Sequence, residues 1–89
     1  MDRRLIRAGR ALLGWSQQEL ADRAGVQRLV VVRYENGTQT PHPRNMDCLT
    51  AAFDRAGVEQ FIREDGATGV VMRASIFAAL RDKSDAKSS

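Results

Sequence analysis

Arginine supplies most of the chemistry that this sequence offers. Residues 1–57 hold nine Arg against six acidic residues, whereas residues 58–89 balance five basic with five acidic residues, so the net charge of +3 belongs to the first two-thirds of the chain. A guanidinium presents a planar fork of donors that suits phosphate oxygens and guanine edges, where lysine offers a point charge. This placement favours contacts with phosphates, and solvated helix faces are the alternative.

Groups that could catalyse a reaction or hold a metal are few and scattered. The chain has one histidine, His42, and one cysteine, Cys48, and neither stands at the spacing of a nucleophile–base pair or a metal-ligand set. We therefore expect His42 to be a loop residue or a phosphate donor, and Cys48 a small core or boundary residue. The sequence predicts a protein that is not an enzyme and that uses no cofactor and no metal.

The expected compartment is the cytoplasm, without a membrane partner. No apolar run approaches the ~20 residues of a bilayer-spanning helix, and the charged start "MDRRLIRAGR" does not read as a secretory signal. A single cysteine forms no internal disulfide, which suits a reducing compartment.

Two helices are predicted before residue 25, because start and stop signals frame each of them. Apolar residues repeat at helical spacing over 3–13, between a capping Asp and a Gly. A second helix is predicted over 17–24, because Ser16 and Glu19 have the spacing of a capping box. Gly25 ends that helix, since glycine accepts the left-handed conformation found after helix C-termini.

The stretch "RLVVVRYE" at 28–35 contains a β-branched run that alone suggests a strand. We predict a helix, because a strand would place Val31 and Arg33 on the same side and mix core with charge. A helix instead brings Val31 and Tyr34 to one face, and Asn-Gly at 36–37 then ends it. The β-branching costs a few tenths of a kcal/mol per residue against better helix formers.

The remaining elements complete a mainly α fold, a four- to five-helix bundle with a C-terminal β-hairpin. A fourth helix is predicted over about 44–56, and an Asp-Gly turn joins strands at about 58–63 and 68–73. A short helix is expected at 75–82, and the polar residues 84–89 are expected to form a flexible tail.

The tight, glycine-containing connection between the second and third helices predicts a helix-turn-helix. Residues 4–57 resemble the Cro/repressor-type (xenobiotic-response-element-like) helix-turn-helix family of bacterial and phage transcription regulators, and "AGVEQFIREDGATGVVMR" resembles a tail of short bacterial members. The residues that carry the resemblance are Arg10, Trp15-Ser16-Gln17, Leu20-Ala21, Ala24-Gly25-Val26, Val31, Glu35, Gly37 and Pro41. The resemblance implies a sequence-specific regulator of double-stranded DNA, a repressor that binds paired half-sites as a homodimer and is nucleoid-associated when bound.

The resemblance also implies a role for individual residues. In this chain the base-reading positions, on a recognition helix at about 27–35, are Gln27, Arg28, Leu29, Val32 and Arg33. The phosphate-contacting positions are Ser16, Gln17, Asn36, Thr38, Thr40, His42 and Arg44. For Ser16 and Gln17 the position in the sequence supports the same role, because they lie at the start of the predicted second helix and the free N–H groups at a helix N-terminus favour a phosphate. Arg10 and Glu35 match a semi-buried ion pair of the family.

The recognition helix departs from the family pattern at Leu29, Val30 and Val32, where small polar residues are usual. Three explanations for these apolar residues remain open. The apolar groups meet thymine methyls in a major groove, or they pack against another protein, or the helix is distorted and buries some of them. The second explanation connects to a different function, an antitoxin-like or adaptor protein whose main role is to bind a protein partner.

The domain organisation expected from these patterns has three parts. Residues 1–57 form the DNA-binding domain, residues 58–83 extend it with the hairpin and short helix, and residues 84–89 are the tail. Edge strands of a hairpin invite pairing with a second copy, so the extension predicts a homodimer; the alternative is that it only covers the open face of the bundle. The expected interface residues are Phe61, Ile62, Val70, Val71, Met72, Ile76 and Phe77.

Overall fold

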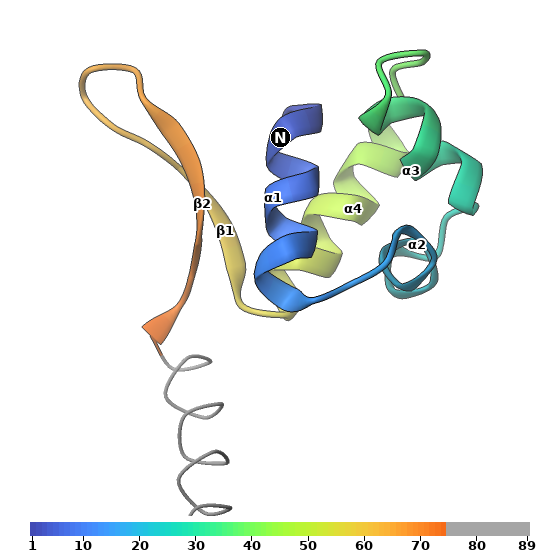
Figure 1. Ribbon diagram of the computed structural model, residues 1–89, viewed down its shortest axis with the longest axis horizontal. Helices are drawn as coiled ribbons and strands as arrows, with labels where there is room; N and C mark the ends of the chain where they lie inside the picture. Colours follow the sequence, from blue (N-terminus) through green and yellow to red (C-terminus); the bar gives the residue numbers. More distant parts are fainter. Residues whose placement is uncertain (75–89) are drawn as a thin grey trace, which may run out of the picture.

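The computed structural model describes residues 1–74 and shows four helices with a two-stranded hairpin packed beside them (Figure 1). In chain order the elements are α1 (Arg3–Leu13), α2 (Gln17–Ala24), α3 (Arg28–Glu35), α4 (Pro43–Arg55), β1 (Val58–Ile62) and β2 (Thr68–Met72). The predicted fold class, a mainly helical bundle with a C-terminal hairpin, is confirmed. The helix expected at 75–82, with Ile76 and Phe77, and the tail at 84–89 lie outside the described residues.

The first two helices begin and end where their capping residues predict. The Asp2 carboxylate accepts two backbone N–H groups of the first turn of α1. At α2, Ser16 Oγ accepts the N–H of Glu19 at 3.0 Å, and the Glu19 carboxylate accepts the N–H of Ser16 at 3.5 Å, which completes the capping box. Gly14 and Gly25 adopt the left-handed conformation after the two helices.

The β-branched run of α3 is helical, as the pattern of charge and core predicts. Val31 is fully buried, and α3 ends at Glu35 with Asn36 as its C-cap and Gly37 at a φ of 78°. The fourth helix begins at Pro43, one residue before the expected start, because proline at the first helical position loses no hydrogen bond. No helix in residues 1–74 combines the length and the apolar content that a membrane crossing requires.

The core lies where α1, α2, α3 and α4 converge. Its fully or nearly fully buried members are Ile6, Leu20, Ala21, Val31, Leu49, Ala52, Phe53 and Val58. Phe53 is the largest of them, and the Trp15 ring stacks on it with the centroids 6.0 Å apart. Gly9 is buried against the Phe53 ring. A Cβ at this position would lie only 2.8 Å from Phe53 Cε1, which is too close for a real contact. Close approach of α1 to α4 therefore requires glycine at this position.

The hairpin is fixed to the bundle at its base. In its antiparallel register Val58 opposes Met72 and Gln60 opposes Val70; Val58 is buried and Val70 packs against the core. Arg73 anchors the end of β2, because its backbone N–H donates to the Gly57 carbonyl at 2.7 Å and its guanidinium donates to the Asp54 carboxylate at 2.9 Å. Helices α1 and α4 thus stand between the hairpin and α3 (Figure 1).

Candidate nucleic-acid interface

One face of α3 points away from the core and carries most of the predicted base-reading residues. Gln27, Arg28 and Arg33 are exposed, Leu29 is 51% exposed and Val32 is partly exposed. Gln27 caps α3 without a side-chain hydrogen bond, so its amide is free to meet a ligand. Among the ion pairs of residues 1–74, none involves Arg28 or Arg33. The face is therefore cationic and apolar at once.

The four apolar residues of α3 have different environments. Val31 enters the core, whereas Val30 lines a small hollow with Gln39, Pro41, His42 and Asn45. Leu29 and Val32 remain on the outer face of a regular helix. The idea that distortion buries the run thus fails for Leu29, and the two contacts that remain for it are thymine methyls or another protein.

Glu35 is the point where the first three helices are joined. Its carboxylate is buried, and Arg10 donates to it through Nε and Nη2, both at 2.7 Å. Gln17 Nε2 donates to the same carboxylate at 3.2 Å. The hydrogen bond from Arg10 to Glu35 raises the pKa of the Arg10 guanidinium. The structure therefore pairs Arg10 with Glu35, and the pair fixes α3 relative to α1.

Two further arginines of α1 reach the end of α3, and neither was among the residues predicted for the site. The Arg7 guanidinium donates to the Glu35 backbone carbonyl and lies 4.0 Å from its carboxylate. The Arg3 guanidinium lies against Gly37, where a Cβ would collide with it. The spacing of Arg3, Arg7 and Arg10 was the available signal, because i, i+4 and i+7 share one face of a helix.

The residues expected to contact phosphate at the start of α2 have different surroundings. Ser16 is exposed, and its hydroxyl oxygen is occupied by the capping bond to Glu19. Gln17 is partly buried, and its amide nitrogen already donates to Glu35. A primary amide has a second N–H and an acceptor oxygen, so Gln17 retains polar atoms for a ligand while Glu35 holds it in place.

The segment between α3 and α4, together with the first turn of α4, carries the other expected phosphate contacts, and all of them are exposed. The Asn36 side-chain oxygen accepts from the backbone N–H and the hydroxyl of Thr38, which orders the turn. His42 Nδ1 accepts the Arg44 backbone N–H at 3.1 Å. Because Nδ1 acts as an acceptor, the neutral imidazole carries its proton on Nε2, which can donate to a phosphate. Thr40 and Arg44 make no side-chain hydrogen bond within residues 1–74.

The residues expected at a dimer interface divide between the two faces of the hairpin. Val70 and Met72 share the face of buried Val58, which is turned to the bundle. Phe61 and Val71 are on the outer face and are 39% and 38% exposed. Ile62 shares the inner face but is 71% exposed. The hairpin therefore covers the bundle and also presents apolar side chains to the outside.

Comparisons with known proteins place this geometry in a family. The helix-turn-helix family model matches residues 6–56, a segment that contains α2, α3 and the Arg10–Glu35 pair. An uncharacterized HTH-type transcriptional regulator of Methanothermobacter thermautotrophicus is 37% identical over 67 residues, which cover 73% of this chain and 97% of that relative. The resemblance seen in the sequence is confirmed, and the chain belongs to the Cro/C1-type helix-turn-helix family of DNA-binding transcription regulators.

Proposed function

We propose that this protein is a sequence-specific, double-stranded-DNA-binding repressor that acts in the cytoplasm and inserts α3 into the major groove. The observation that carries the proposal is the outer face of α3, where Gln27, Arg28 and Arg33 are exposed without a carboxylate partner in residues 1–74. Repression follows from occupancy, because a protein on the major groove excludes other proteins from the same site.

The side chains on this face divide the work of recognition. Arg28 and Arg33 have the fork that bonds guanine O6 and N7, a contact worth roughly 1–3 kcal/mol of discrimination against the wrong base. We assign Leu29 and Val32 to thymine methyls, because they lie between these arginines on the same exposed face. Arg44 and His42 then meet the phosphate backbone beside the groove, where an open hollow of about 340 Å³ is lined by them and Asn45.

The test is selection of bound duplexes from a random pool, followed by salt titrations on the selected sequence. We expect Arg28→Ala and Arg33→Ala to relax base preference at two different positions. Arg44→Ala is expected to weaken binding to all duplexes alike. It should also reduce the slope of the logarithm of the binding constant against the logarithm of the salt concentration by about one, because each phosphate contact releases a counterion. Arg63→Ala, in the exposed hairpin turn, is the matched control and should change neither property.

The same titration separates the repressor from an adaptor that binds only a protein. A DNA reader loses affinity steeply as salt rises. If no duplex is enriched, or if the affinity of the wild type does not depend on salt, the proposal is wrong.

We also propose that the protein forms a homodimer through the hairpin, and that this homodimer binds paired half-sites on the DNA. The supporting observation is the outer face of the hairpin, where Phe61 and Val71 are exposed at diagonal positions on neighbouring strands, Phe61 opposite Gly69 and Val71 opposite Glu59. Apolar groups gathered on a surface in this way mark interfaces more often than isolated ones do. The hairpin and α3 lie on opposite sides of α1 and α4 (Figure 1), so a second copy there leaves the recognition helix uncovered.

A further inference from the structure

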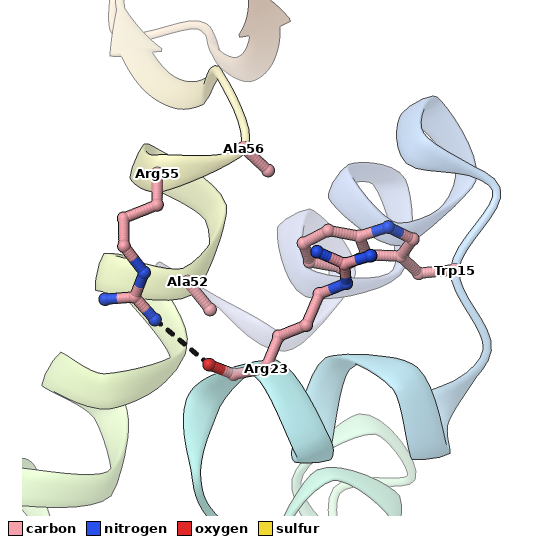
Figure 2. A pocket seen from close by; sticks show the side chains of 5 residues that line it. All are labelled: Trp15, Arg23, Ala52, Arg55 and Ala56. Carbon is pink, nitrogen blue, oxygen red and sulfur yellow. Dashed lines mark hydrogen bonds between the residues drawn. The ribbon is translucent and has the colours of Figure 1, made fainter.

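We infer that the protein has a second ligand site, a pocket that binds a small carboxylate with an apolar body. Trp15, Arg23, Ala52, Arg55 and Ala56 line a cavity of about 200 Å³. Figure 2 shows the Arg55 guanidinium directed at the Arg23 backbone oxygen, and the Arg23 side chain extending to the other side of the pocket, where its guanidinium lies over the Trp15 ring. None of the five residues belongs to α3 or to the segment that follows it, so the pocket is separate from the DNA-binding face.

Both guanidinium groups are held in place and still have donors to offer. The Arg23 guanidinium carbon lies 4.6 Å from the Trp15 ring centroid, a cation–π contact that leaves the N–H edges of the group free. Arg55 Nη2 donates to the Arg23 backbone carbonyl at 3.0 Å. A guanidinium has five N–H donors, and neither arginine forms an ion pair with a carboxylate in the described part of the chain.

The rest of the lining selects the kind of anion. Ala52, Ala56 and the Trp15 ring give the pocket an apolar side, which suits a hydrophobic group attached to the charged one. The C-terminal ends of α2 and α4 meet here, and their negative partial charge opposes any anion, and a dianion such as phosphate more strongly than a monoanion, so the two arginines must supply the attraction. A monoanionic carboxylate therefore fits best, and we choose benzoate as the probe because its ring can pack beside Trp15.

Trp15 makes the test direct, because it is the single tryptophan of the chain and lies in the pocket. Benzoate, or its neutral analogue benzamide, is titrated at constant ionic strength while tryptophan fluorescence is recorded. We expect a saturable change with benzoate and none with benzamide. In Arg55→Gln the affinity should fall at least tenfold, whereas Arg63→Gln, with the same loss of charge on the hairpin, should bind as the wild type does.

Arg23→Gln requires a different measurement, because loss of the cation–π contact changes the fluorescence itself. Here binding is followed by the proton NMR signals of benzoate, and we expect them to lose the broadening that the wild type causes. Thermal unfolding without ligand checks that each variant folds, and Arg55→Lys, which keeps the charge but loses the fork, replaces Arg55→Gln if that variant does not. Equal responses to benzoate and benzamide, or wild-type affinity in whichever Arg55 variant folds, would overturn the inference. No DNA is present, so the result is independent of the proposed function.

Discussion

At the scale of single residues, the buried carboxylate of Glu35 holds α3, the proposed recognition helix, against α1 and α2. It is 3% exposed, and burying a charge without partners is far more costly than leaving it in water. Donors from α1 and α2 reach it, namely Arg10 from the first helix and Gln17 from the second. Because each donor comes from a different element, Glu35 joins three helices through one side chain.

We predict that Arg10→Met lowers the free energy of unfolding by about 3 kcal/mol, because removing one partner leaves a buried charge behind. Glu35→Leu combined with Arg10→Met should cost less than the sum of the single variants, as a double-mutant cycle by urea denaturation measures. The exposed pair of Arg63 and Asp65, 3.1 Å apart, is the control, and breaking it should cost at most about 1 kcal/mol. Additive costs for the Arg10–Glu35 cycle would contradict this role.

At the scale of helices and strands, the features that could be predicted were those encoded by neighbouring residues in the sequence. Capping residues and glycines set the ends of α1 and α2, and the end of α3 follows from Asn-Gly at 36–37. Tertiary contacts left no such local signal. Trp15 stacks on Phe53, Arg73 holds the hairpin on α4, and Gln17 bonds to Glu35. Each of these contacts joins elements whose relative placement only packing determines.

The cap of α1 predicts a dependence of stability on pH. The pKa of Asp2 is lowered from 3.8, first by the hydrogen bond from the Leu5 backbone N–H and further by those from Arg4. A lowered pKa in the folded state means that the ionised cap stabilises the protein above about 3.8 and that this contribution is lost as the pH falls through the lowered pKa. Asp2→Asn keeps a capping side chain that does not titrate.

We therefore expect the free energy of unfolding of the wild type to exceed that of Asp2→Asn by its full amount at neutral pH, and this difference to disappear in strong acid. Urea unfolding followed by circular dichroism at both pH values measures the difference. A gap of the same size at neutral and acid pH would show that the charge of Asp2 does not contribute. Asp47→Asn, at an exposed position inside α4, controls for general effects of removing a carboxylate.

At the scale of the whole molecule, the hairpin and α3 pack against the same hydrophobic core. Arg73 ties β2 to the end of α4, and Val58 and Val70 pack into the same core as Val31 of α3. A dimer formed through the hairpin would consequently hold two recognition helices at a fixed separation and angle. Fixed geometry of this kind is what allows a protein to read the spacing of two half-sites.

The dimer is tested by Val71→Lys, which places a charge on the outer face of the hairpin. We expect the wild type to sediment as a dimer and Val71→Lys as a monomer, whereas Thr68→Lys, on the opposite face, should remain dimeric. Inserting about 5 bp, half a helical turn, between selected half-sites turns them to opposite sides of the duplex. The insertion should weaken binding by the wild type strongly and binding by the monomeric variant hardly at all, because only a rigid dimer needs both half-sites on one side. Equal sensitivity of the two proteins to the insertion would show that the hairpin does not set the spacing.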